Sequence, residues 1–122
     1  MDWHEWRNKT GEDAIMLAIR GSREEARAKF NEMLEGIMQQ EDIEYRAISL
    51  LYLSSCELKA GFHEESDADL EKALSIALGE PQKHRLRYKS YKTADGQVFN
   101  KISAREFIKI EKERRQARKS WG

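Results

Sequence analysis

The chain has 122 residues, 39% of them hydrophobic and 36% charged, with a formal net charge of zero, which is typical of one domain built mainly from amphipathic helices. Cys56 is the only cysteine, so an intrachain disulfide and a thiolate metal cluster are excluded and a reducing compartment is favoured. A run of about 18 apolar residues and the basic start of a signal peptide are both missing, so we predict a cytoplasmic protein without a membrane segment.

The first two thirds of the chain contain two similar stretches at a spacing of 40 residues. The matched residues are Gly21, Glu24, Glu25, Ala28 and Leu34 with Gly61, Glu64, Glu65, Ala68 and Leu74. Each glycine lies where one apolar helical pattern ends and another begins, and glycine can adopt the left-handed conformation that closes a helix. The glutamates that follow favour the positive end of the next helix dipole. Each stretch is therefore predicted to be a hairpin of two antiparallel helices.

The pattern of large and small residues in these hairpins resembles the tetratricopeptide repeat over about residues 7–80. In the second hairpin it is carried by Leu50, Leu53, Ser54, Gly61, Ser66, Leu70 and Ala73, and in the first by Ala14, Leu17, Gly21, Ala26 and Phe30. Thr10 and Asp13 depart from the pattern where large apolar residues are usual, and Glu57 replaces an aromatic residue. The resemblance implies two stacked hairpins with helices or connections longer than those of the usual repeat of about 34 residues.

A partner groove is the second implication of this resemblance, because family members often bind an extended peptide on the surface made by the first helix of each hairpin. The matching positions in this chain are Ile15, Ile19, Ile48, Leu51, Ser55, Leu58 and Lys59. They are mostly apolar, so the groove is expected to receive the amphipathic helix of a partner or the C-terminal helix of this chain itself.

Two hairpins are fewer than the roughly three that usually bury a continuous core, so their ends need covering. Trp3 and Trp6 are spaced to form a short N-terminal helix or cap on the first hairpin. The basic region after the second hairpin, or a second copy of the chain in a homodimer, would cover the other end.

A new region begins after Gly79 and Pro81, which together are typical of a helix stop. Apolar and basic residues alternate over Arg85–Ile102 around Asp95 and Gly96, which predicts a β-hairpin. Ser103 then starts a final helix by a capping box with Glu106. We predict a mainly α fold with two tetratricopeptide-like hairpins, a short β-hairpin and a basic C-terminal helix, in which an acidic body (1–82) and a basic region (83–122) pack as one domain.

The charge of these two parts is opposite, since residues 1–82 hold 9 Lys and Arg against 18 Asp and Glu, whereas residues 83–122 hold 13 against 4. The basic side chains that could bind an anion are Arg85, Arg87, Lys89, Lys92, Arg114, Arg115, Arg118 and Lys119. Aromatic residues that could stack on bases lie among them: Tyr88, Tyr91, Phe99 and Trp121. A solvated charged helix, stabilised by its dipole, is the alternative interpretation of the same run.

Side chains that would carry catalysis are not brought together by the sequence pattern. His4, His63 and His84 are scattered without partners at zinc-ligand spacing, so neither a metal nor a cofactor is expected. Cys56 lies in an apolar helix, where packing is its expected role. No phosphate-binding glycine loop occurs in the sequence. These observations predict a protein that is not an enzyme.

The leading hypothesis is a protein-interaction adaptor or regulator whose helical body binds a partner while the basic C-terminal region docks on an acidic surface. One alternative is a nucleic-acid-binding regulator, of phage or plasmid origin, whose basic region contacts the phosphates of DNA or RNA. Another is a homo-oligomer in which the acidic body receives the basic region of a neighbouring copy.

Overall fold

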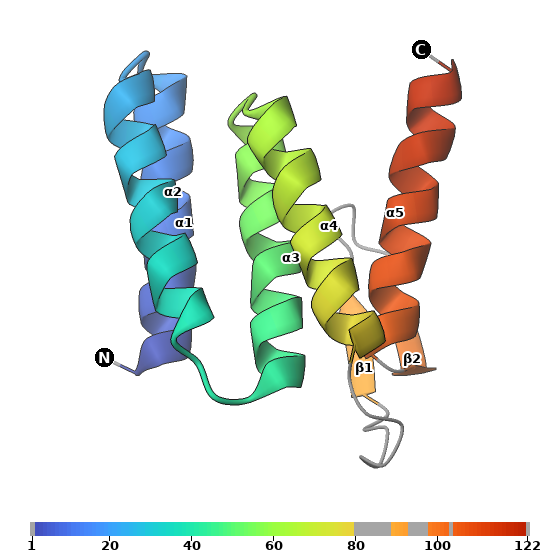
Figure 1. Cartoon of the computed structure of the whole chain (residues 1–122). Helices are drawn as coiled ribbons and strands as arrows, with labels where there is room; N and C mark the ends of the chain where they lie inside the picture. The colour runs from blue at the N-terminus through green and yellow to red at the C-terminus, as the bar shows by residue number, and fades with distance from the viewer. Residues whose placement is uncertain (1, 80–88, 93–97, 103, 122) are drawn as a thin grey trace.

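The computed structural model describes residues 2–79, 89–92, 98–102 and 104–121, and side chains over 2–76, at Val98 and over 106–117. Four helices form two antiparallel hairpins, α1 (Trp3–Ile19) with α2 (Arg23–Met38) and α3 (Ile43–Lys59) with α4 (His63–Gly79). The strands β1 (Lys89–Lys92) and β2 (Val98–Ile102) and the helix α5 (Ala104–Trp121) follow. The two hairpins stand side by side, and α5 lies against the far side of the second (Figure 1).

The first helix of each hairpin begins at an aspartate that caps it. The side chain of Asp2 accepts a hydrogen bond from the backbone N–H of Glu5 at 2.8 Å, and Asp42 accepts one from Tyr45 at 3.0 Å. Such a cap satisfies an N–H that has no partner within the helix and stabilises the helix by about 1 kcal/mol. Trp3 and Trp6 belong to the first two turns of α1, so they form no additional short helix, but both lie next to Gly36 of α2 and so pack on the first hairpin as predicted.

The two hairpin turns have the same geometry. Gly21 and Gly61 have φ angles of 89° and 84°, a region that glycine adopts without strain. The N–H that follows each glycine reaches back to the preceding helix, from Ser22 to the Leu17 carbonyl at 2.9 Å and from Phe62 to the Glu57 carbonyl at 2.8 Å. This is the Schellman pattern of helix closure. The predicted role of both glycines in ending a helix is confirmed.

The buried core lies in the helices and at the second turn. Ala14, Ala26, Met33, Ile37, Ala47, Leu50 and Leu53 are fully buried. Phe62, in the turn between α3 and α4, meets Phe30 of α2 edge-on with ring centroids 5.6 Å apart. Burying a side chain of this size stabilises the fold by about 1.5–3 kcal/mol, so this aromatic pair is a principal link between the two hairpins.

The predicted fold class needs correction, because five helices carry the fold and the buried side chains that the structure describes lie in helices or at a helix turn. Within the predicted span Arg85–Ile102, the structure describes only a four-residue and a five-residue strand, which pair antiparallel with Tyr91 opposite Phe99. The predicted turn at Asp95 and Gly96 lies outside the described residues. Two strands alone are marginal in water, whereas every core residue of the described chain lies in a helix or at a helix turn.

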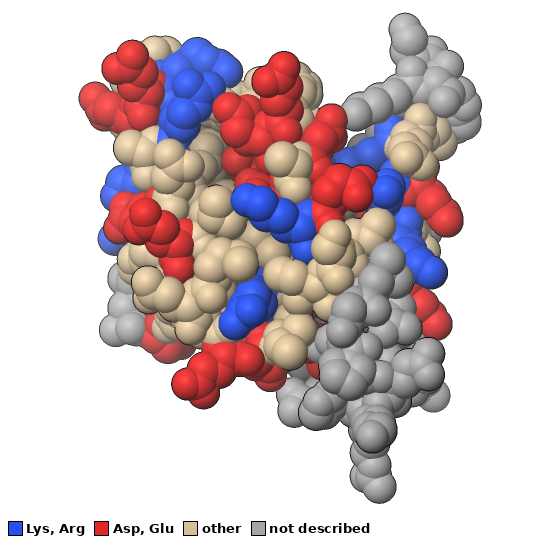
Figure 2. All heavy atoms as spheres, in the orientation of Figure 1, with Lys and Arg blue, Asp and Glu red and all other residues tan. Residues whose placement is uncertain are grey.

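The C-terminal helix begins at Ala104, next to the predicted start, while Ser103 and its capping box lie outside the described residues. Phe107 and Ile108 of α5 are buried, so this helix belongs to the packed body. Acidic side chains gather along the upper edge of the face shown in Figure 2, and basic ones lie among them and over α5. Within the described residues, no helix combines the length and apolarity that crossing a bilayer requires.

Candidate functional site

Helix α3 lies between α1 and α5, and its residues divide into sides that face different neighbours. Ser49 and Cys56 face α1, where they contact Arg7 and approach Gly11, whereas Ser54 faces α4 and α5. Ile48, Tyr52, Ser55 and Lys59 follow one another along one side of α3 at helical spacing and are here called the α3 strip. Lys59 is exposed and the other three are half-buried. The strip is thus accessible but flanked on both sides.

An aromatic–arginine cluster, made of Trp3, Arg7, Tyr45 and Tyr52, joins α1 to α3 beside this strip. The guanidinium carbon of Arg7 lies 4.5 Å from the ring centroid of Tyr52, 5.7 Å from that of Tyr45 and 6.0 Å from that of Trp3. Trp3 and Tyr45 also meet edge-on at 5.2 Å. A cation held over aromatic faces gains about 0.5–2 kcal/mol, so the cluster fixes the first turns of both helices against each other.

Arg7 is buried without a carboxylate partner among the described residues. Its Nη1 donates to the Ser49 hydroxyl at 2.9 Å, and its Nε and Nη2 donate to the Asn8 side chain at 3.2 and 3.1 Å. Burial lowers the pKa of Arg7, while the nearby Tyr45 and Tyr52 side chains act in the opposite direction. The charge is therefore offset by aromatic faces and neutral acceptors.

Gly11 allows α1 and α3 to approach closely next to the cluster. A Cβ at Gly11 would lie 3.0 Å from the Cys56 Sγ and 3.1 Å from the Tyr52 Cε1. Tyr52 in turn donates its hydroxyl to the Asn8 carbonyl at 3.3 Å. Burial raises the pKa of both the Cys56 thiol and the Tyr52 hydroxyl, so both groups stay neutral at physiological pH. The predicted packing role of Cys56 agrees with its burial.

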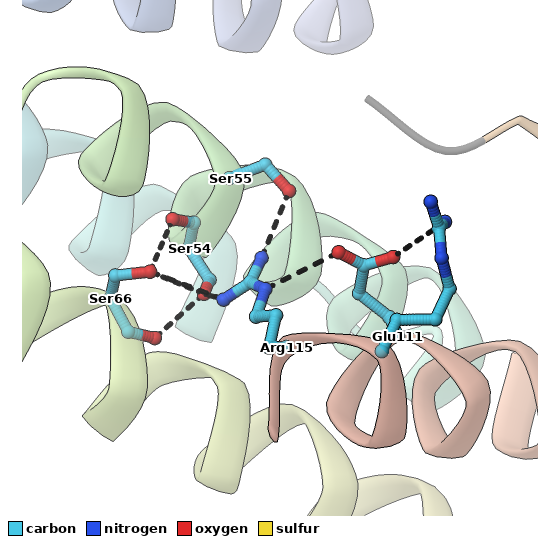
Figure 3. A network of polar contacts seen from close by, with 6 residues as sticks. Ser54, Ser55, Ser66, Glu111 and Arg115 are labelled. Atoms are coloured by element: carbon cyan, nitrogen blue, oxygen red, sulfur yellow. Dashed lines mark hydrogen bonds and ion pairs between the residues drawn. The ribbon is translucent and has the colours of Figure 1, made fainter. Parts of the chain in front are cut away.

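Arg115 of α5 inserts between α3 and α4 at a pair of serines (Figure 3). Its Nη1 donates to the hydroxyls of Ser54 at 2.7 Å and Ser66 at 3.2 Å, and its Nη2 donates to Ser55 at 3.3 Å. Its Nε donates to Glu111, one turn earlier on α5, at 3.3 Å. The guanidinium is thus surrounded by acceptors from three helices, and its charge is balanced within its own helix.

This arrangement corrects the predicted anion-binding set. Arg115 is only 6% exposed and already bound, so its assignment to an anionic partner is wrong. Arg114 is half-buried and pairs with Glu111 at 3.5 Å, so it is also engaged within the chain. The other predicted side chains lie outside those that the structure describes: Arg85, Arg87, Lys89, Lys92, Arg118 and Lys119, together with Tyr88, Tyr91, Phe99 and Trp121.

The predicted partner groove is only partly where the resemblance put it. Ile48, Ser55 and Lys59 lie on the α3 strip. Leu51 is 5% exposed and belongs to the core, so its predicted role as a groove residue is wrong. The remaining predicted positions differ in exposure: Ile15 and Leu58 are half-buried, and Ile19 is 69% exposed.

A second buried polar group lies nearby, between α3 and α4. Glu57 and Asp69 are 4% and 5% exposed, and one carboxyl oxygen of Glu57, Oε1, has no hydrogen-bond partner. Burial, assisted by a hydrogen bond with Asp69 and by that group's charge, raises the pKa of Glu57 far above its usual range. Lys72 pairs with Asp69 at 3.7 Å. Glu57 is therefore a neutral carboxylic acid at physiological pH.

Sequence reasoning missed the aromatic–arginine cluster, although its spacing gave a signal. Trp3 and Arg7 are four residues apart, and Tyr45 and Tyr52 are seven apart, so each pair lies on one face of a helix. Which faces meet depends on the packing of α1 on α3, which the sequence pattern does not state. Among the described residues, no group of three or more His, Cys, Asp or Glu side chains is placed to hold a metal ion.

No protein-family model, curated protein or solved structure matches the chain. The resemblance to the tetratricopeptide repeat accordingly stays a prediction from the sequence. The structure itself shows two helical hairpins, closed by turns of the same geometry and packed side by side.

Proposed function

We propose that the chain is a non-catalytic, cytoplasmic protein-interaction module, an adaptor or regulator, that binds a partner protein on the α3 strip. The observation that carries this proposal is the aromatic–arginine cluster beside the strip. Trp and Tyr are enriched at energetically important interface positions, and Trp3, Tyr45 and Tyr52 are half-buried, whereas buried Arg7 supports their rings from within the chain. Contacts within the cluster hold these side chains in place, so binding would cost little side-chain entropy.

The composition of the strip supports a partner segment with both apolar and acidic side chains. Ile48 and Tyr52 offer apolar surface, and exposed Lys59 offers a positive charge about two to three helical turns away. An amphipathic helix with an acidic residue on its apolar edge would match both features. The basic C-terminal region would add long-range attraction to an acidic partner. Within the described part of α5, Lys109 is an exposed basic side chain that would contribute to this attraction.

The test compares charge reversal on and off the strip. Lys59→Glu should reduce capture of a partner from cell extract by about tenfold, because it opposes the charge that the strip offers. Lys9→Glu, the matched control, changes an exposed lysine on α1 outside the strip and should leave capture unchanged. Equal capture by the wild-type chain and Lys59→Glu would exclude the strip from binding.

The same protein preparation separates the two alternative functions. A titration with single- and double-stranded DNA and RNA at low and at physiological salt would show a steep loss of affinity with salt if the chain binds phosphates. Sedimentation under the same two conditions would show a salt-sensitive oligomer if the basic region docks on a neighbouring copy. A monomer with no salt-dependent nucleic-acid binding is the result that the protein-interaction proposal expects.

A further inference from the structure

We infer that α5 is a releasable cap on the second hairpin, which holds it by a polar contact. This contact can open without leaving a buried polar group unpaired on either side. The contact consists of Arg115 and Glu111 on α5 and Ser54 and Ser66 on the hairpin, and Figure 3 shows all four side chains together.

The serines on the hairpin side of the contact keep their own hydrogen bonds without α5. The Ser54 hydroxyl donates to the Ser66 carbonyl at 2.6 Å, and the Ser66 hydroxyl donates to the Ser54 carbonyl at 2.7 Å. Because a serine hydroxyl carries one proton, these two bonds use the donor of each residue. Arg115 approaches only the remaining lone pairs of the two oxygens, which water can reach once α5 has left. Release therefore breaks no bond within the hairpin.

The charged groups on the α5 side of the contact are also paired with each other without the hairpin. Arg115 and Glu111 are one turn apart on the same helix, with Nε and Oε1 separated by 3.3 Å. The same carboxylate accepts from Arg114 at 3.5 Å. The positive and negative charges consequently leave together as an i, i+4 pair and become solvated. A buried arginine whose counterion belonged to the hairpin would instead leave an uncompensated buried charge behind.

Among the described residues of α5, the apolar side chains that oppose this release are buried Phe107 and Ile108 and partly buried Ile110. The two buried side chains lie near the N-terminal end of the helix. Lys112 pairs with Glu71 of α4 at 2.7 Å, but Glu71 is more than half exposed, so this bond contributes little. The contacts shown by the described part of α5 thus include an apolar anchor near its N-terminal end and a polar contact two turns further along.

Release would change the proposed binding surface, and this consequence rests on the proposed function. Arg115 donates to Ser55, which belongs to the α3 strip, so α5 forms one border of that strip. Undocking of α5 removes this border and frees the Ser55 hydroxyl, so the position of α5 regulates how much of the strip a partner can reach.

Hydrogen exchange of the full chain, with no partner present, tests the release itself. Backbone amides of residues 107–117 should exchange at least about tenfold faster than those in the middle of α3 and α4, because α5 opens as a unit while the hairpins stay folded. Equal exchange in α5, α3 and α4 would overturn the inference, since all three helices would then open only together. The measurement does not involve binding, so the strip could fail as a binding site without affecting this result.

A pair of variants tests the polar contact as the cause of release. Replacing the ion pair by apolar residues of similar size, Glu111→Leu with Arg115→Met, should raise the protection of α5 about fivefold or more, because the cost of burying two charges disappears. Lys109→Met on the exposed side of α5 is the control and should leave protection unchanged. Lower α5 protection in the double variant, with α3 and α4 unaffected, would show that the buried ion pair stabilises docking more than apolar side chains of similar size do, and it would overturn the inference.

Discussion

The two hairpins have the same turns but different residues where their helices meet. Ala14 and Ala26 of the first hairpin correspond to Ser54 and Ser66 of the second, and all four are fully buried. A hydroxyl adds little volume to alanine but supplies an acceptor for a charged donor. This difference gives the second hairpin a place for the guanidinium of Arg115, and with it a fifth helix.

The hairpins also differ at two further matched positions. The residue after the turn glycine is half-buried Ser22 in the first hairpin and buried Phe62 in the second. Half-buried Leu17 in α1 corresponds to buried Glu57 in α3. One replacement adds a contact between hairpins, and the other places a carboxyl group where an apolar side chain would fit. The second hairpin therefore differs from the first both in its contacts with other helices and in its buried polar groups.

The largest loss of stability is expected at the turn of the second hairpin. Phe62→Ala should lower the free energy of unfolding by about 3–5 kcal/mol, because Phe62 is buried against Phe30 and beneath the guanidinium of Arg23. Ser22→Ala at the matched position should change it by less than about 0.5 kcal/mol, since the Ser22 side chain makes no capping bond. Urea unfolding of both variants measures the difference, and equal effects would mean that the turns do not differ in this way.

Converting the serine pair to the alanines of the first hairpin should have the next largest effect. Ser54→Ala with Ser66→Ala removes two acceptors of Arg115 and should cost about 1–3 kcal/mol in the free energy of unfolding. Ser55→Ala removes a single longer bond and should cost less than about 1 kcal/mol. A double variant as stable as the wild type would show that the hydroxyls do not hold the guanidinium.

Glu57 should make stability fall as pH rises. Its pKa is raised in the folded chain, so between the unfolded pKa near 4.5 and the higher folded pKa the native state binds one more proton than the unfolded state. The free energy of unfolding is then largest below the unfolded pKa and decreases above it by up to about 1.4 kcal/mol per pH unit. Glu57→Gln removes this loss and should be more stable than the wild type by about 1–3 kcal/mol at pH 8. Parallel pH profiles for the two proteins between pH 5 and 8 would contradict the assignment.

A modest and equal loss of stability is expected at the two glycines, where the hairpins agree. Gly21→Ala and Gly61→Ala should each cost about 1–2 kcal/mol, because both positions have positive φ and neither Cβ would meet an atom closer than 3.8 Å. The two costs should agree within about 0.5 kcal/mol, since only the backbone is strained. A clear difference between their thermal unfolding midpoints would show that the turns are not equivalent.

Local signals predicted the hairpins but not their contacts. Gly21 and Gly61 identify the turns because few residues other than glycine adopt a left-handed conformation. The aspartate caps and the glutamates of α2 and α4 mark helix starts for similarly local reasons. The alternating residues of 85–102 suggested a β-hairpin as a main element, but the packed core is formed by helices. Local alternation does not reveal what a strand pair packs against.

Arg115 shows most clearly why the candidate site could not be predicted in full. In the sequence it is one cation in a charged run, and nothing local distinguishes a solvated arginine from an inserted one. Its burial depends on Ser54 and Ser66, which lie 61 and 49 residues earlier in the chain. Arg7 depends in the same way on Ser49, 42 residues later. Such long-range polar contacts follow from helix packing.

A double-mutant cycle between the serine pair and Arg115 tests the central claim that this contact joins α5 to the second hairpin. The four proteins are the wild type, Ser54→Ala with Ser66→Ala, Arg115→Met, and all three changes together, each unfolded in urea at neutral pH. The alanines remove two hydrogen bonds between the serines in any background, and they also remove two acceptors of Arg115, a loss that occurs only when the guanidinium is present. We therefore expect a coupling free energy of about 1–3 kcal/mol. A coupling free energy of zero, with the two sets of changes acting additively, would contradict the claim.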